Sequence, residues 1–376
     1  MSKTRKKLRE LCRQYDLGVQ ILETYALSVR DIIPVRKVFR LVTDRGDICL
    51  KRFNHSEDSL NFSLSAINHL VTHGFTQVAP FLPTRKGQPY LKLNNQLYVL
   101  TNWIDGRESD YANPADLRIA ARTLANLHLA SQGFVPPPGH DHRVRWGTWP
   151  DTFRNRRDEL ITFAEQIRRQ ASLTRFDVAF LNHVEQYVTQ IELTLTQLAA
   201  SPYEILVARE SMMGGFCHHD FAHHNLVITN GGIGYVLDFD YAICDIRIHD
   251  IGSLILRALK AAAWDFGQVE LVLRAYQEVS PLSKEELAVL QPFFTFPQDF
   301  WRIAVDHYYG LKPHWPQAKF QRKLDRILDN EPYRQAFLET YARYFEQAVE
   351  NSSWQTPRLV VHSRPRIWRL ASPTMA

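Results

Sequence analysis

Residues 217–225 read CHHDFAHHN, which places one cysteine, four histidines and one aspartate within nine residues. Zinc binds cysteine and histidine, and His219 and His223 would share a face if this stretch were helical. The residues that follow show no helical apolar period, however, and turn into a β-prone run at 226–228. An extended chain points neighbouring side chains to opposite sides, which would scatter the ligands. A zinc-binding regulatory protein is therefore an alternative that rests on this stretch alone.

The residues after the histidine-rich stretch predict a different kind of site. Gly231-Gly232 lies between the β-prone runs LVIT and IGYVLD, which is typical of a hairpin with a two-residue turn. In that register Asn230 pairs with Ile233, and Asn225 pairs with Asp238. Cross-strand Cβ atoms lie roughly 4.5–5.5 Å apart, so an amide oxygen and a carboxylate would face one another. Two such oxygen ligands suit Mg²⁺, with phosphate and water completing the coordination.

Asp220 lies five residues before Asn225, on the loop ahead of the first strand. A carboxylate in that place would take a proton from a substrate hydroxyl beside a metal-bound phosphate. Phosphoryl transfer requires this combination of positioning, charge neutralisation and one oriented base. The alternative is a surface turn with incidental polar residues.

These residues resemble the signatures of the kinase-like superfamily. The series His218-x-Asp220-x4-Asn225 is similar to its H-x-D-x4-N motif, and Asp238-Phe239-Asp240 is similar to its D-F-G-type motif. The Asp-Phe-Asp variant resembles the small-molecule branch, which holds aminoglycoside phosphotransferases, choline kinases and homoserine kinase-like proteins. The resemblance implies ATP and Mg²⁺ as cofactors, Asp220 as the catalytic residue, Asn225 and Asp238 as metal ligands, and Asp240 as an aid to a second ion.

Other positions extend the resemblance. Lys51, which ends ICLK, resembles the strand lysine that holds ATP phosphates. Residues 97–106 resemble the hinge between the lobes, and the backbone of Asn102, Trp103 and Ile104 is expected to meet adenine. LANLH at 124–128 resembles the helix that precedes the catalytic loop.

Two further residues are expected to support the catalytic loop. Asp250 in IHDIGSLI matches the aspartate that starts the next helix and braces that loop; a plain N-cap is the alternative. His218 is then structural, and His219, His223 and His224 are variable loop residues.

The sequence departs from protein kinases in two places. The stretch SVRDIIPVRKVFR, which corresponds to their glycine-rich loop, contains no glycine. The helix expected at 60–71 contains no acidic partner for Lys51; Glu57 and Asp58 lie just before it. Both departures concern nucleotide affinity and leave Asp220 and the metal pair untouched.

Within the small-molecule branch the chain resembles the CotS family of spore coat-associated proteins from endospore-forming bacteria. The likeness is carried by PVRKVFRLVTDRGDICLKRF, LTNWIDGRE, GTWP at 147–150 and the catalytic stretch. It implies a Mg-ATP-dependent phosphotransferase acting on a small-molecule hydroxyl, with a role in spore coat formation and with other coat proteins as partners. The alternative is a catalytically weak or inactive kinase-like protein that binds within the coat.

The elements that must position these residues divide into a β-rich and a helical part. VFRLVT and ICLKRF flank the turn DRGD, and a second strand pair is expected at 89–93 and 97–100 around Asn94-Asn95. Beyond 113 the chain reads as helical, with Asn113-Pro114 as a helix start, two long helices in 151–200, and Ser283 with Glu286 as a capping box.

We therefore expect an α+β, protein kinase-like fold of two lobes, with a small antiparallel sheet in the first lobe and a larger, mostly helical second lobe. The predicted limits are 1–101 for the first lobe, 102–106 for the hinge, 107–350 for the second lobe and 351–376 for a basic tail.

The bulk composition agrees with such a protein. The 376 residues are 45% hydrophobic, with a net charge of +5 that is mild for this length and does not indicate nucleic-acid binding. The basic stretches at 3–9 and 364–369 are expected to be solvated termini. The four cysteines form no CxxC pair, and no apolar run approaches the ~20 residues of a membrane span. These features favour an intracellular protein, and the resemblance to the CotS family implies the cytoplasm of the mother cell and the spore coat as its places.

Overall fold

The first lobe is a sheet whose strands alternate in the side chains that they present to its two faces. In the computed structural model, which describes residues 10 and 12–350, five antiparallel strands lie in the order β1-β2-β3-β5-β4. Their bounds are β1 Val29–Val35, β2 Val38–Thr43, β3 Gly46–Phe53, β4 Leu91–Leu93 and β5 Gln96–Asn102. Tyr98 and Leu100 of β5 pack on the face that helix α2 (Val19–Thr24) covers, whereas Leu97 and Val99 face helix α3 (Glu57–Thr72).

Both predicted hairpins are confirmed. Thr43 pairs with Gly46 across the β2–β3 turn. Leu93 pairs with Gln96 across the β4–β5 turn, where Asn94 and Asn95 have φ of 49° and 61°. Asparagine tolerates these left-handed angles, which a type I′ turn requires at both central residues. Strand β1 and helix α2 were not predicted.

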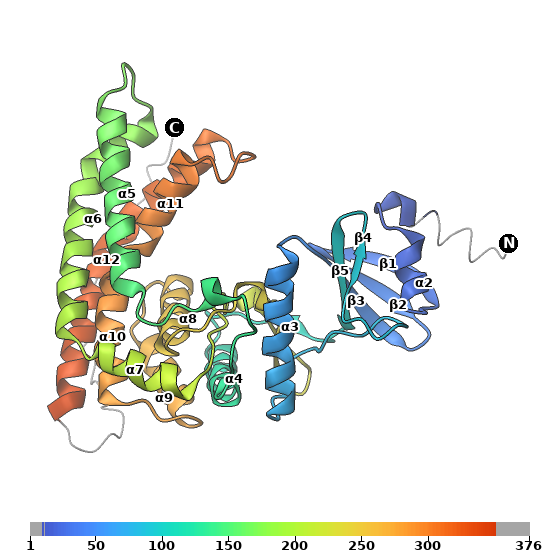
Figure 1. Ribbon diagram of the computed structural model, residues 1–376. Coiled ribbons are helices and arrows are strands. Elements are labelled where there is room, and N and C mark those ends of the chain that lie inside the picture. The colour runs from blue at the N-terminus through green and yellow to red at the C-terminus, as the bar shows by residue number, and fades with distance from the viewer. Residues whose placement is uncertain (1–9, 11, 351–376) are drawn as a thin grey trace, which may run out of the picture.

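Helix α3 lies between the two lobes (Figure 1). Ser56 caps it by accepting a hydrogen bond from the Ser59 amide. Leu60 and Leu64 pack on the sheet, while Phe62 and Leu70 belong to the core of the second lobe. The helix is therefore buried on both sides, and it ties the lobes together.

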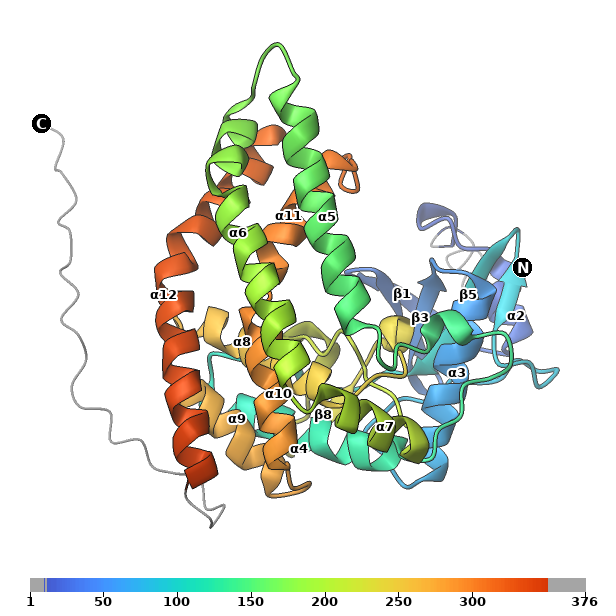
Figure 2. The ribbon, with the colours of Figure 1, turned by 60° about the vertical axis from the view of Figure 1, so that its left-hand side comes forward.

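The second lobe is mostly helical. Its helices are α4 Pro114–Ser131, α5 Trp149–Arg168, α6 Arg175–Ala200, α7 Tyr203–Met213, α8 Ile248–Ala261, α9 Gly267–Gln277, α10 Lys284–Thr295, α11 Gln298–Tyr308 and α12 Gln317–Glu350. The Asn113 cap of α4, the two long helices α5 and α6, and the capping box of Ser283 and Glu286 are as predicted. Helices α5 and α6 project together from the lobe, and α11 and α12 lie beside them (Figure 2).

A small second sheet carries the catalytic stretch. Strands β6 (Arg107–Glu108), β7 (Leu226–Ile228) and β8 (Gly234–Val236) pair in that order and are antiparallel. Short 3-10 turns at Asp141–Arg143, His223–Asn225 and Phe239–Tyr241 complete the described elements. Among the described helices, none is long and apolar enough to cross a membrane. The predicted tail, 351–376, and the basic stretch at 3–9 lie outside the described residues.

Candidate functional site

The β7–β8 hairpin forms as predicted, but its register differs by one residue. Leu226 pairs with Val236, and the Leu237 amide donates to the Asn225 carbonyl at 2.8 Å, so Asn225 faces Leu237 rather than Asp238. The predicted two-residue turn is wrong because the loop has three residues. The Gly232 amide donates to the Thr229 carbonyl, and Gly232 has a φ of 73°. A type I turn followed by one left-handed residue is the usual three-residue hairpin loop.

The Asp238 carboxylate reaches the space between the lobes through its backbone conformation. Asp238 has φ 63° and ψ 71°, a left-handed conformation that costs a non-glycine residue roughly 1 kcal/mol or more. Its Oδ1 accepts a hydrogen bond from Lys51 Nζ at 2.7 Å, and Asp240 Oδ2 accepts one at 2.8 Å. One lysine of the first lobe thus contacts two carboxylates of the second, far along the chain.

The two carboxylates differ in the direction of their pKa shifts. Burial raises the pKa of Asp238, but the Lys51 ammonium outweighs burial and leaves that pKa below its ordinary value. Burial, with a contribution from the Asp238 carboxylate, raises the pKa of Asp240 to about 7 despite Lys51. Burial lowers the pKa of Lys51, but the two aspartates outweigh it and raise that pKa. The two close carboxylates share the single positive charge of Lys51, so their negative charges are only partly compensated.

Asp220 and Asn225 lie in direct contact. Asn225 Nδ2 donates to the Asp220 carbonyl at 2.9 Å and to Asp220 Oδ2 at 3.2 Å. This arrangement uses the amide nitrogen and leaves the Asn225 Oδ1 oxygen for a cation. Asp220 Oδ1 accepts a hydrogen bond from Arg257 Nη2 at 2.8 Å.

His218 and Asp250 lie beneath this loop. Asp250 is fully buried, and its two carboxylate oxygens accept hydrogen bonds from the His218 amide at 2.6 Å and the His219 amide at 2.9 Å. His218 Nε2 lies 2.9 Å from the Leu237 carbonyl, and His128 Nε2 lies 3.3 Å from Asp250. These contacts hold the loop against the hairpin.

The structure gives Lys51 partners other than the two considered from the sequence. Glu57 bonds with the Tyr90 hydroxyl at 2.6 Å and with Lys92 at 2.7 Å, and Asp58 forms ion pairs with His140 and His142. The stretch without glycine forms β1, β2 and a two-residue turn between them, in which Arg36 has a φ of 54°.

The expected hinge residues follow the end of β5. Asn102 is the last residue of that strand and pairs with Ile48. The Trp103 amide donates to the Asp47 carbonyl at 2.9 Å, which extends the ladder by one bond. That amide is therefore not available to a nucleotide base.

Two arginines next to the acidic residues were missed from the sequence. Arg143 Nη1 donates to the carbonyls of Asp240 and Ala242 at 2.9 and 3.1 Å, and nothing in the sequence indicates this contact. Arg257 lies seven residues after Asp250 on α8, which places both on one helix face. The seven-residue spacing from Asp250 could therefore have indicated Arg257 from the sequence.

The zinc interpretation gains no support from the described residues. The only group there with metal-ligand spacing is His128, Cys217 and Asp250, all buried. Its atoms already have protein partners, since Cys217 Sγ donates to the Asp245 and Ile246 carbonyls and His128 Nδ1 lies 2.8 Å from the Tyr276 hydroxyl. Burial raises the pKa of the Cys217 thiol well above its usual range, whereas zinc requires a thiolate.

The family model for "Spore coat putative kinase YutH" matches residues 19–341 of this chain. The chain belongs to this family of putative spore coat kinases. The match covers both lobes, so the resemblance drawn from the motifs is confirmed at the level of the family.

Known relatives agree with this membership. Spore coat protein S of Bacillus subtilis (strain 168) is 25% identical over 313 residues, which cover 83% of this chain and 88% of the relative. An aminoglycoside phosphotransferase structure from Alicyclobacillus acidocaldarius superposes with a TM-score of 0.75 at 21% identity and covers 88% of this chain and 97% of that one. A spectinomycin phosphotransferase structure, in complex with ADP and spectinomycin, gives a TM-score of 0.61 at 14% identity, with the same two coverages. The kinase-like two-lobed α+β fold is thereby confirmed.

Proposed function

We propose that this protein transfers the γ-phosphoryl group of Mg-ATP to a hydroxyl of a small molecule, as part of spore coat formation. One observation carries the proposal: Lys51 of the first lobe contacts Asp238 and Asp240 of the second at 2.7 and 2.8 Å. This contact supports the proposal because it joins the lysine that we assign to phosphate binding with two carboxylates that follow the hairpin of Asn225. The ADP in the related spectinomycin phosphotransferase structure supports nucleotide as the ligand.

The residues present fit a magnesium ion. Asn225 Oδ1 and the Asp238 and Asp240 carboxylates are the hard oxygen ligands that Mg²⁺ prefers. When bound, the ion would neutralise phosphate charge. Lys51, freed from its two aspartates, would bind the α and β phosphates, while Asn102 and Ile104 would meet the base. We assign Trp103 only a supporting role, because its amide is bonded within the sheet.

Asp220 would accept the proton of the acceptor hydroxyl. The hydroxyl oxygen forms a bond to the γ-phosphorus while the bond from that phosphorus to the bridging oxygen of ADP breaks. The proton passes to the Asp220 carboxylate, and ADP leaves with the bonding electrons. Asp250 and His218 position the loop, so that catalysis rests on placement and electrostatics.

The second candidate function is a kinase-like coat protein that binds without catalysis. The glycine-free turn at Arg36 and Lys37 favours it, because side chains there keep backbone amides farther from phosphate than glycine would. The complete set Asp220, Asn225 and Asp238 opposes it.

ATP turnover separates the two functions. We expect slow, Mg²⁺-dependent ADP formation by the wild type that Asp220→Asn lowers by about 100-fold or more, since a general base contributes roughly 10²–10⁴-fold. Asp158→Asn, an exposed aspartate on α5, serves as the control and should keep the wild-type rate. Equal rates in wild type and Asp220→Asn would contradict the enzymatic function.

A further inference from the structure

Both oxygens of the Asp220 carboxylate are occupied. Oδ2 accepts from Asn225 at 3.2 Å, and Oδ1 accepts from Arg257 at 2.8 Å. Each oxygen keeps a second lone pair, but the Arg257 guanidinium lies against Oδ1 and compensates the charge of the carboxylate there, so an acceptor hydroxyl docks more readily once Arg257 has moved away. The side chain of Arg257 is 36% exposed, which gives it room to move.

A second guanidinium of this lobe forms no ion pair with the described residues. Arg156 of α5 lies 3.9 Å from the ring centroid of Trp301 and donates to the neutral Gln298 side chain at 2.7 Å. Arg302, whose charge acts on Arg156, forms an ion pair with Asp306 at 3.0 Å, and Lys260 of α8 forms one with Asp299 at 2.5 Å. Among the described residues, no carboxylate lies within 4.0 Å of Arg156. The Glu159 carboxylate, which accepts hydrogen bonds from Trp301 and Tyr309, offsets the burial of Arg156 only in part. A partly buried and partly compensated charge is costly, and a bound anion would lower that cost.

The electrostatic effect of Arg156 extends to the catalytic loop. Burial lowers the pKa of Arg156 to about 10. Burial, together with the charges of His249 and Arg156, lowers the pKa of His219 to about 3. The packing of α8 on α11 supports this: Lys260, three residues after Arg257 on α8, pairs with Asp299, which directly follows Gln298, the partner of Arg156. Arg156 therefore lies on the side of the lobe where α8 carries Arg257 to Asp220.

A cavity of about 650 Å³ adjoins this region, with walls from α8, α11 and α12. Gln298, the partner of Arg156, lines it, as do Leu256 and Lys260, which flank Arg257 on α8. Lys323 and Arg326 make no ion pair with any described residue. The charged residues that line this cavity are five basic and three acidic ones. They are Lys260, Arg302, Lys323, Arg326 and Arg334 on the basic side, and Asp299, Asp306 and Glu331 on the acidic side.

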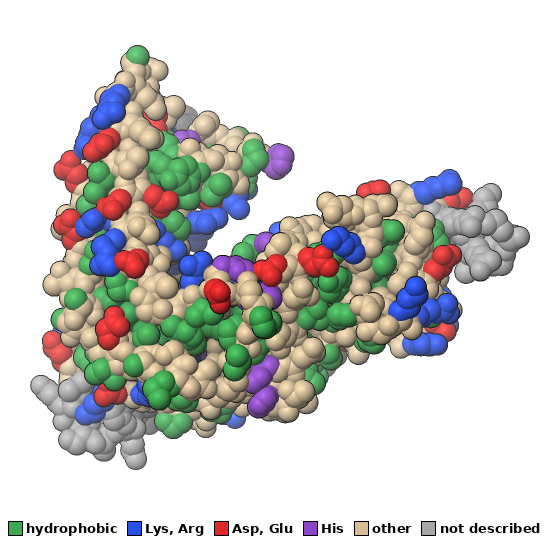
Figure 3. All heavy atoms as spheres, in the orientation of Figure 1, with side chains coloured by type: hydrophobic (Ala, Val, Ile, Leu, Met, Phe, Trp, Pro, Cys, Tyr) green, Lys and Arg blue, Asp and Glu red, His purple; other side chains and the backbone are tan. Residues whose placement is uncertain are grey.

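Figure 3 shows a deep hollow between the projecting helices and the rest of the molecule. Lys and Arg side chains (blue) gather at the base of the projecting helices, and His (purple) and acidic (red) side chains lie along the floor beside them.

We propose that the acceptor is a small alcohol that carries an anionic group, a carboxylate or a phosphate, which binds Arg156 and draws Arg257 away from Asp220. The inference rests on the proposed phosphotransferase function and adds the substrate class. Arg156 is then a substrate-binding residue. Arg257 is a positioning residue that keeps the base in an ion pair until an anionic acceptor arrives.

Anion binding tests this directly. The full-length protein, saturated with Mg²⁺ and the ATP analogue AMP-PNP, is titrated with inorganic phosphate and with glycerate in a calorimeter. We expect both to bind, and Arg156→Gln to weaken both by about tenfold or more, as for loss of a charged hydrogen bond. Arg154→Gln is the matched control, because Arg154 lies on the same helix, is exposed and pairs with Asp151 at 2.6 Å. Absence of anion binding to the wild type, or equal affinities in Arg156→Gln, overturns the proposal.

Steady-state kinetics test the role of Arg257 and the substrate class separately. Arg257→Gln should raise acceptor-free ADP formation severalfold, because the base is no longer held in an ion pair, whereas a merely structural arginine would lower it. Among acceptors matched in size, kcat/KM should favour glycerate over glycerol and ethanolamine. Equal or better turnover of the neutral or cationic alcohol contradicts the substrate class. Failure of AMP-PNP to bind would instead contradict the proposed function, and the two failures are thereby distinguished.

Discussion

Single residues of this protein carry charges that the fold leaves only partly compensated. Lys51 serves two carboxylates, Arg156 has a neutral partner, and Asp238 adopts a left-handed backbone. Such local costs persist where the rest of the fold enforces them, and they concentrate at functional sites. Lys51 and Asp238 contact one another, and the charge of Arg156 acts on His219, the residue before Asp220.

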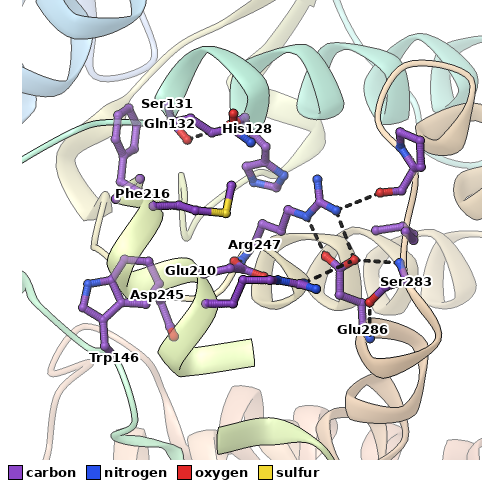
Figure 4. A pocket seen from close by; sticks show the side chains of 16 residues that line it. His128, Ser131, Gln132, Trp146, Glu210, Phe216, Asp245, Arg247, Ser283 and Glu286 are labelled. Atoms are coloured by element: carbon purple, nitrogen blue, oxygen red, sulfur yellow. Dashed lines mark hydrogen bonds and ion pairs between the residues drawn. The ribbon is translucent and has the colours of Figure 1, made fainter. Parts of the chain in front are cut away.

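Glu210 is another residue whose charge is only partly compensated, and it lies away from Lys51 and Asp220. It lines a separate cavity of about 300 Å³ in the helical lobe and is 9% exposed (Figure 4). Its Oε2 accepts the Arg247 amide at 2.7 Å, while Oε1 has no hydrogen-bond partner. Arg247 is itself engaged by Glu286, and Arg209 lies 3.7 Å from Glu210 Oε1. Burial, together with the Glu286 charge, raises the pKa of Glu210 to about 7.

Replacing this carboxylate should stabilise the protein in a pH-dependent way. Because the folded pKa lies above the ordinary 4.5, the folded state holds a proton that the unfolded chain has lost. The free energy of unfolding therefore falls as pH rises from 4.5 to 7. Glu210→Gln keeps the acceptor for the Arg247 amide and removes the charge, so it should gain about 1–3 kcal/mol at pH 8 and little near pH 4.5.

Urea unfolding at the two pH values measures this difference. Glu204→Gln, on the exposed side of the same helix, makes an equal change in charge outside the buried cluster and should not reproduce the gain. A destabilised Glu210→Gln at pH 8 would show that the carboxylate is held by stronger contacts than those described.

Elements differed in how well the sequence predicted them. Hairpins with asparagine or glycine turns and helices with side-chain caps were predictable, because local residues determine them. The β7–β8 register was not, since NGG suits both a two-residue turn and a three-residue loop with Gly232 left-handed. The partners of Lys51 were beyond sequence reasoning, because Asp238 lies 187 residues away and meets it only through the packing of two lobes.

Helix α8 is the element on which most of the site depends, since it carries both Asp250 and Arg257. Gly252 lets this helix approach α10: a Cβ on Gly252 would lie 2.4 Å from Phe293 Cδ1. Gly252→Ala should therefore destabilise by about 1–3 kcal/mol, although alanine is the better helix former. Gly267→Ala on α9 is the control, because the nearest atom to its Cβ is 3.4 Å away. Chemical denaturation of both variants measures the effect, and a Gly252→Ala protein as stable as the wild type would disprove tight packing here.

At the scale of the whole molecule, the lobes form one site only together. Lys51 comes from the sheet, Asp238 and Asp240 from the turn after the β7–β8 hairpin, and Asp220 from the loop that α8 braces. The chain's membership in the putative spore coat kinases gives this arrangement its context. A nucleotide bound in the cleft would have to separate Lys51 from its two aspartates and take over their charges.

Thermal unfolding with AMP-PNP, with and without Mg²⁺, tests this claim most directly. At about 100 times its Kd, the ligand should stabilise the wild type by about 2.7 kcal/mol, a rise in Tm of roughly 3 °C, and only when Mg²⁺ is present. Lys51→Met and Asp238→Asn should each lose most of that rise relative to their own ligand-free Tm, whereas Lys86→Met, an exposed lysine of the same lobe, should keep it. An equal rise in Lys51→Met and Asp238→Asn, or one that needs no Mg²⁺, would contradict a shared magnesium–nucleotide site.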